Sequence, residues 1–96
     1  MDKFVKNLED KHAHEEEGKV SFMCIFCKAG GKLRWYQNKS EIFQGFKYHI
    51  ESDGPEHRLV INKLNPDDAA KYICKINDIE TSANLTITGK FKSIES

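Results

Sequence analysis

Apolar and polar residues alternate over short runs along most of this chain, and turn-forming residues separate the runs. Such alternation is typical of strands that bury one face. The clearest run spans residues 20–27 and has two apolar sides. Its expected inward residues are Val20, Phe22, Cys24 and Phe26, and its expected outward residues are Ser21, Met23, Ile25 and Cys27. Later inward positions are expected at Leu33, Trp35, Leu59, Ile61, Tyr72, Cys74 and Ile76. Tyr48 and Ile50 are assigned to another short strand, Leu64 follows the inward pair Leu59 and Ile61, and Ala83, Leu85 and Ile87 complete the last strand.

The remaining elements follow from weaker signals. Phe4 and Leu8 are assigned to a first strand, and Ile42 is expected to start a short edge strand. Turns are expected at residues 15–18, 38–40, 52–55, 65–68 and 77–78, which are rich in Gly, Pro, Asn, Asp and Ser or in acidic residues. The pattern predicts an N-terminal tail over 1–3, one all-β domain over 4–88 and a C-terminal linker over 89–96.

Four residues at characteristic separations predict the kind of β fold. In a two-sheet sandwich with Greek-key connections, one cysteine on each sheet faces the other across the core and a tryptophan covers them. A tyrosine two residues before the second cysteine anchors the neighbouring turn. Cys24, Trp35, Tyr72 and Cys74 occur in that order, and Asp68 begins the motif Asp-x-Ala-x-Tyr-x-Cys. We therefore expect an immunoglobulin-like sandwich whose core includes these four residues and Leu59.

With these positions placed, the chain resembles the intermediate set (I-set) of immunoglobulin domains, in particular those of intracellular muscle proteins such as titin and myosin-binding protein C. The resemblance covers roughly residues 4–88 and is carried mainly by the segments 17–24, 35–38, 47–54, 57–61 and 67–74. Two positions depart from the family pattern. Lys39 and Ala70 stand where family members often have glycine, so the turn at 38–40 is expected to change type or to hold a non-glycine residue at positive φ.

Composition and charge limit the function classes. Ninety-six residues make a single domain, and 15 basic residues balance 15 acidic ones. A net charge of zero argues against nucleic acid as a partner. The longest apolar stretch, residues 22–27, is too short to cross a bilayer, and residues 1–4 show no apolar leader. We expect no membrane association, and a monomeric state for the isolated domain.

The three cysteines bear on the cellular compartment. Cys24 and Cys74 could form a disulfide or remain as buried thiols, and the sequence leaves both open. Cys27 is expected to face outward and to be unpaired, which a reducing interior tolerates better. The sequons at Asn38 and Asn84 would matter only after secretion. We expect a cytoplasmic protein.

Candidate chemistry is sparse. Cys24 and Cys27 form a Cys-x-x-Cys motif, but residues three apart on a strand face opposite sides and cannot readily share a metal. His12 and His14 would share a face on an extended segment, and solvated histidines are the simpler interpretation. No phosphate loop or nucleophile motif occurs. We expect no catalysis, no metal and no cofactor.

Exposed residues suggest a binding role instead. Tyr36 is expected to lie outward beside Arg34, and with Lys47 or His49 it could form a partner surface. Met23 and Ile25 raise the same question on the other sheet, although scattered surface apolar residues are common.

The resemblance implies a non-enzymatic structural and protein-binding module of a larger sarcomeric filament protein. Its implied partners are myosin, actin, or neighbouring immunoglobulin and fibronectin-type domains. The alternatives are an extracellular adhesion or receptor domain and, from another class, a zinc or redox protein using Cys24 and Cys27.

Overall fold

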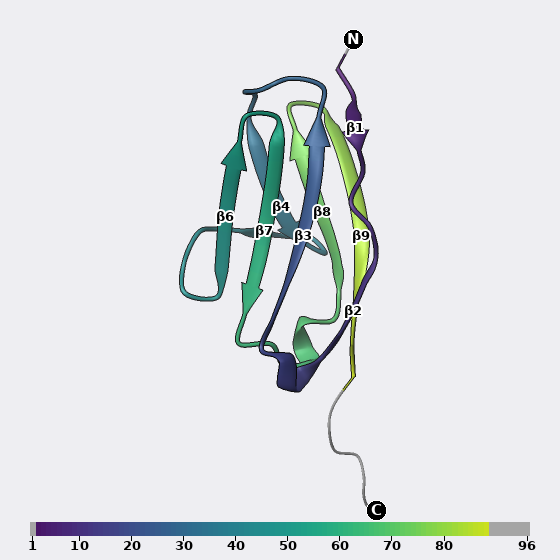
Figure 1. Cartoon of the computed structure of the whole chain (residues 1–96), viewed down its shortest axis with the longest axis vertical. Helices are drawn as coiled ribbons and strands as arrows, with labels where there is room; N and C mark the ends of the chain where they lie inside the picture. The colour runs from purple at the N-terminus through teal and green to yellow at the C-terminus, as the bar shows by residue number, and fades with distance from the viewer. Residues whose placement is uncertain (1, 89–96) are drawn as a thin grey trace, which may run out of the picture.

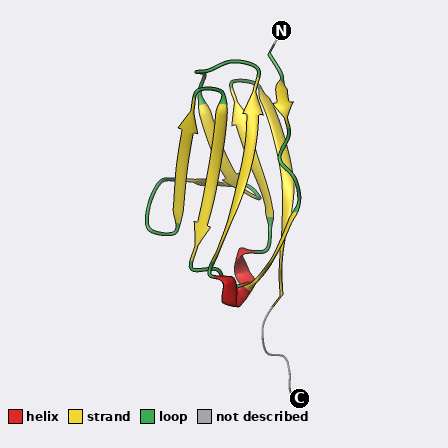
Figure 2. Cartoon of the chain, viewed as in Figure 1, coloured by secondary structure: helices red, strands yellow, loops and turns green. Residues whose placement is uncertain are grey.

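The computed structural model describes residues 2–88, and these form two β-sheets packed face to face (Figure 1). Strands dominate, and the two described helices are single 3-10 turns (Figure 2). The strands are β1 (Phe4–Lys6), β2 (Lys11–His14), β3 (Lys19–Phe26), β4 (Leu33–Gln37), β5 (Ser40–Ile42), β6 (Tyr48–Asp53), β7 (Glu56–Asn62), β8 (Lys71–Ile76) and β9 (Ile79–Thr88). The helices are η1 (Glu15–Glu17) and η2 (Pro66–Asp68). Neither described helix has the length and apolar character that a membrane crossing requires.

One sheet has four strands in the order β1-β3-β7-β6, and the other has five in the order β2-β9-β8-β4-β5. Strands that are distant in sequence are therefore neighbours, as β3 is of β7 and β8 is of β4. The chain crosses between the sheets after β1, through η1, after β3, after β5 and through η2. The predicted immunoglobulin-like, all-β sandwich with Greek-key connections is confirmed.

The N-terminal segment differs from the prediction, because it forms two strands instead of one. β1 pairs antiparallel with β3, whereas β2 pairs parallel with β9 in the opposite sheet. Leu8 lies between β1 and β2, is buried, and donates its backbone N–H to the hydroxyl of Thr81 at 3.2 Å. Because Leu8 is held in the core, the segment before it can pair with the edge of one sheet and the segment after it with the edge of the other.

Strand alternation produces the core. The inward side chains of β3, β7 and β8 are 0–1% exposed, apart from partly buried Val20 at the start of β3 and His57, which is also buried but 4% exposed. Leu33, Tyr48, Ile50 and Ile87 are only partly buried and pack at the margin of this cluster. The core is continuous because both sheets contribute one face to it.

Two turns refine the predicted element boundaries. Ile42 ends β5 instead of starting it, because only Ser40, Glu41 and Ile42 reach β4 in register. In the preceding turn the positive φ falls on Asn38, at 54°, and not on Lys39. Asparagine tolerates this region better than most residues, so the turn does not need the family's glycine.

The predicted N-terminal tail contacts the sandwich. Asp2 and Lys3, assigned to a tail, contact the domain: the backbone carbonyl of Lys3 accepts the Cys27 N–H at 2.9 Å, and Asp2 pairs with Lys28 at 3.1 Å. The predicted linker over 89–96 lies outside the described residues.

Candidate functional site

The predicted core residues meet at the centre of the sandwich. Cys24 on β3 and Cys74 on β8 come from opposite sheets, and their sulfurs lie 3.5 Å apart as free thiols. Trp35 on β4 is the cross-strand neighbour of Cys74, and Leu59 on β7 faces the same interior. All four are at most 1% exposed. The hydrogen bond with Cys24, together with burial, raises the pKa of the Cys74 thiol, so Cys74 stays protonated.

The tyrosine-corner residues join η2 to the start of β8. The Tyr72 hydroxyl donates to the backbone carbonyl of Asp68 at 2.6 Å and accepts from the Gln37 amide at 3.0 Å. Burial is the main cause that raises the pKa of Tyr72, so the hydroxyl remains a donor. Asp68 makes this contact with its backbone carbonyl, so its side-chain carboxylate is available for other contacts.

The Asp68 carboxylate is buried and accepts two hydrogen bonds. One comes from the Asn65 N–H at 3.0 Å, which closes the turn of η2, and the other from the Lys47 ammonium at 2.5 Å. Lys47 also donates to the carbonyl of Lys63 at 2.8 Å. Lys47 therefore links the start of β6 to η2, from which the chain enters the other sheet.

The four residues of the predicted partner surface do not come together. Arg34 and Tyr36 point outward from β4 in the five-stranded sheet, whereas His49 points outward from β6 in the four-stranded sheet. The Lys47 ammonium forms an ion pair with the Asp68 carboxylate, so it does not extend toward either group. The prediction of one shared surface is corrected, because alternation shows which residues of a strand face outward but does not show to which sheet the strand belongs.

The two cysteines of the Cys-x-x-Cys motif point to opposite sides. Cys24 is buried, and Cys27 is exposed just after β3, as the strand parity predicted. His12 and His14 do share a face of β2, with ring centres 5.8 Å apart, and His12 bonds the Thr88 hydroxyl at 2.8 Å. Within residues 2–88 no group of three metal-ligating side chains is assembled.

Two structurally important residues were not identified from the sequence. His57 lies on the inward row of β7 beside Leu59, with its Nδ1 2.7 Å from the Ser52 hydroxyl. Strand parity with Leu59 could have revealed it. Gln44 covers the open edge of β6, since its side-chain oxygen accepts the N–H of Ile50 at 2.6 Å. No sequence signal marks Gln44, because the contact depends on how the loop before β6 folds back.

Comparisons with known proteins agree with this architecture. The profile of the family described as "Immunoglobulin I-set domain" matches residues 2–88. The chain is 32% identical over 84 residues to slow-type myosin-binding protein C of Homo sapiens. The aligned region covers 85% of this chain and 7% of that protein. It is 26% identical over 88 residues to the smooth-muscle myosin light chain kinase of Gallus gallus, with 88% and 5% covered. The chain thus spans less than a tenth of the length of these muscle proteins.

Solved structures give the same result. The I9–I11 tandem of titin superposes with a TM-score of 0.87 at 25% identity, covering 93% of this chain and 34% of that one. Domain I10 of titin superposes with a TM-score of 0.85 at 26% identity, covering 92% and 99%. From its profile match and its two-sheet structure, the chain belongs to the immunoglobulin I-set domain family.

Proposed function

We propose that this chain is a non-enzymatic structural and protein-binding module of a larger filament protein of the sarcomere, working in the cytoplasm of muscle. The observation that carries the proposal is where the chain enters and leaves the sandwich. β1 lies at one end of the long axis, and β9 finishes at the opposite end (Figure 1). Further domains joined before β1 and after β9 would extend in line, which suits a chain of tandem modules.

The interior supports a role that depends on rigidity. Core side chains from both sheets interlock, and the contacts of Tyr72 and Asp68 hold the crossing at η2. A rigid sandwich holds its outward side chains in fixed positions, which lowers the entropy cost of binding a partner. The proposed partners are myosin, actin, or adjacent immunoglobulin and fibronectin-type domains, with no nucleic acid or membrane and a monomeric isolated domain.

Localisation of the native protein tests this proposal. An antibody against this chain is expected to stain striated muscle fibres in bands that repeat with the sarcomere. Glycopeptide mass spectrometry of the same native protein is expected to find Asn38 and Asn84 unmodified. Both asparagines are exposed on the domain, so an unmodified state would not result from burial.

The extracellular adhesion or receptor alternative makes the opposite prediction. Glycan on Asn38 or Asn84, or staining at the cell surface without a sarcomeric repeat, would contradict the sarcomeric proposal. The zinc or redox alternative has no geometric support, because Cys24 is buried in the core whereas Cys27 is exposed just after β3.

A further inference from the structure

The outer face of the four-stranded sheet carries a regular grid of side chains on β3, β7 and β6. The register of these strands aligns nine outward residues in three rows, and we call this set the four-stranded face. Its rows are Ser21, Val60 and His49; Met23, Arg58 and Glu51; and Ile25, Glu56 and Asp53. In Figure 1 these strands lie in front of β4 and β8.

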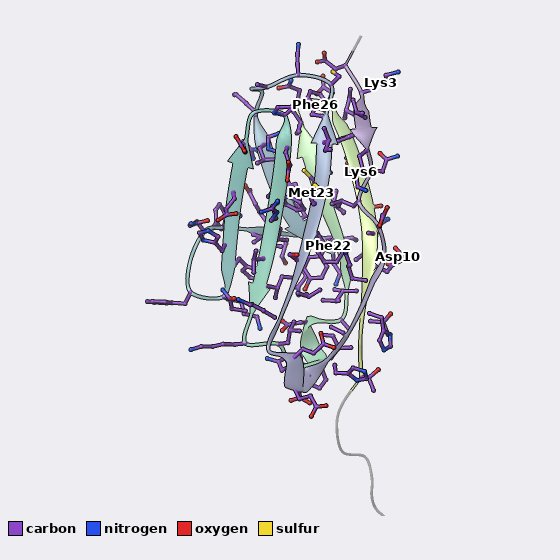
Figure 3. The ribbon with its side chains drawn as sticks, in the orientation of Figure 1. Lys3, Lys6, Asp10, Phe22, Met23 and Phe26 are labelled. Atoms are coloured by element: carbon purple, nitrogen blue, oxygen red, sulfur yellow. The ribbon has the colours of Figure 1, made fainter. Side chains whose placement is uncertain are left out.

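The β3 side of this face is apolar. Met23 and Ile25 are half-buried without any strand covering them, and Val60 lies diagonally next to Met23 (Figure 3 labels Met23 on β3). On β1, Lys6 is the register partner of Ile25, and Val5, which precedes Lys6 where the register shifts, is 66% exposed. Adjacent apolar side chains on an outer sheet face can form a contact surface.

The β6 side of this face is acidic. Glu51, Asp53 and Glu56 contribute three carboxylates, whereas Arg58 contributes the single guanidinium, 2.6 Å from Glu56 and 3.6 Å from Glu51. His49 contacts Glu51 at 2.7 Å. Within the nine residues, three carboxylates stand against one guanidinium, whereas the cations Lys6 and Lys19 lie beside the set, Lys6 on β1 opposite Ile25 and Lys19 at the start of β3 opposite Asn62. These ion pairs are exposed and weak, and their carboxylates remain accessible to a partner.

The two sides share a hollowed surface. One open hollow includes Ser21, Met23 and Val60 in its lining, with Lys11 and Lys19 at the end near the start of β3, and another is lined by Ser52, Asp53 and Glu56 among others. Glu51 and Arg58 line both hollows, so the surface runs from the apolar side to the acidic side without interruption.

We propose that the four-stranded face binds a polypeptide segment that carries a row of apolar side chains beside a row of lysines or arginines. The apolar row would cover Met23, Ile25 and Val60, and the cations would lie against Glu51, Asp53 and Glu56. Charge complementarity selects this occupant, because an acidic segment would meet three carboxylates. This inference rests on the proposed protein-binding function and adds the face and the chemistry of the partner.

The outer face of the five-stranded sheet does not have the same asymmetry. Arg34 pairs with Glu41 at 3.6 Å, and Lys75 lies directly opposite Glu80 in the register of β8 and β9. Each of these cations therefore has a carboxylate beside it. This face provides a matched control for the four-stranded face.

The experiment titrates the full 96-residue chain, labelled with ¹⁵N, with a synthetic amphipathic leucine/lysine peptide. A peptide with the same leucines and with glutamate in place of each lysine is the control probe. Backbone shift changes are expected on β3, β6 and β7 with the lysine peptide only. Raising the salt concentration should weaken this binding, because exposed charges are screened.

Variants locate the contribution of each side of the face. Glu51→Gln with Asp53→Asn should weaken lysine-peptide binding about fivefold, whereas Glu41→Gln with Glu80→Gln, which removes the same charge from the other sheet, should leave it unchanged. Ile25→Thr keeps a β-branched residue on β3 and should weaken binding about threefold with a retained amide spectrum.

Absence of lysine-peptide binding, equal binding of the glutamate peptide, or shift changes centred on β4 and β8 would overturn the inference. An equal loss of lysine-peptide affinity in the Glu51→Gln, Asp53→Asn variant and in the Glu41→Gln, Glu80→Gln variant would also overturn it. None of these results alters the localisation test of the proposed function. Conversely, glycan on Asn84 of the native protein would contradict the sarcomeric proposal and leave the peptide result intact.

Discussion

At the scale of single residues, two buried ring nitrogens in the described part of the chain lack a hydrogen-bond partner. They are Nε1 of Trp35 and Nε2 of His57, in side chains that are 1% and 4% exposed. An unpaired buried polar atom lowers stability, so the packing around each ring has to offset this cost. Trp35 can do so because a buried indole removes a large apolar area from water.

Truncating that indole should destabilise the domain strongly. We expect Trp35→Ala to lower the free energy of unfolding by about 3–5 kcal/mol, as large core truncations do. Cys27→Ser, at an exposed position just after β3, should change it by less than about 0.5 kcal/mol. Denaturant melts monitored by far-UV circular dichroism measure both values. The reverse order would mean that the assigned facing of these side chains is wrong.

Burial of His57 should make stability depend on pH. Burial lowers the pKa of His57 below its ordinary value of 6.5, so the unfolded chain binds more protons once the pH falls through 6.5. The contribution of neutral His57 to the free energy of unfolding should be fully present above pH 6.5 and should be lost as the pH falls below 6.5. Thermal melts between about pH 5 and 7.5 measure the loss, in a range where most carboxylates remain ionised.

His57→Leu removes the titrating ring and should flatten this pH dependence. His49→Gln, at an exposed position on β6, serves as the matched control and should retain it. The same slope in the wild-type chain and in His57→Leu would assign the effect to another group.

At the scale of elements, the connection from β3 to β4 depends on two consecutive glycines with positive φ. Gly30 and Gly31 have φ values of 90° and 101°. An added Cβ on Gly31 would lie 2.8 Å from a methyl carbon of Ile76, whereas a Cβ on Gly30 would meet nothing within 4 Å. Only the second glycine is required by packing as well as by backbone conformation.

This difference predicts unequal effects of one substitution. Gly30→Ala should cost about 1 kcal/mol through backbone strain alone. Gly31→Ala should cost about 2–4 kcal/mol, because displacing Ile76 from the core adds an overpacking penalty to the strain. Urea denaturation of the two variants measures the difference. Equal costs would show that the turn or Ile76 relaxes to accommodate the methyl group.

At the scale of the whole molecule, contacts near the middle and near one end join the two sheets. The Cys24 and Cys74 thiols meet in the middle, and the ion pair between Lys47 and Asp68 connects the start of β6 with η2. Both links join segments far apart in sequence, so they restrict the folded chain as a whole. Their loss should affect global unfolding rather than one strand.

Oxidation provides a test at this scale. Refolding the Cys27→Ser chain with oxidised glutathione should join Cys24 to Cys74, with release of two equivalents of reduced glutathione. The two cysteines are 50 positions apart, so closing that loop should raise the free energy of unfolding by about 4 kcal/mol. Melts of the oxidised and reduced chain give the difference. Oxidised and reduced chain that also carries Cys74→Ala should have the same free energy of unfolding. A gain on oxidation of that variant would assign the effect to another cause.

The sequence by itself determined the fold class and the inward side of β3, β7 and β8. A two-residue period is a local property, so residues such as Phe22, Leu59 and Cys74 could be assigned to the core from parity alone. The signature of Cys24, Trp35, Tyr72 and Cys74 added the kind of sandwich, because these four residues have to meet at its centre.

Only the tertiary structure decided which strands are neighbours and which outward residues share a face. It divided the N-terminal segment between two sheets, separated His49 from Tyr36, and turned Lys47 toward Asp68. It also aligned Met23 with Glu51 across β7. Strand pairing and register depend on contacts between residues distant in the chain, and alternation within one strand contains no information about its neighbours.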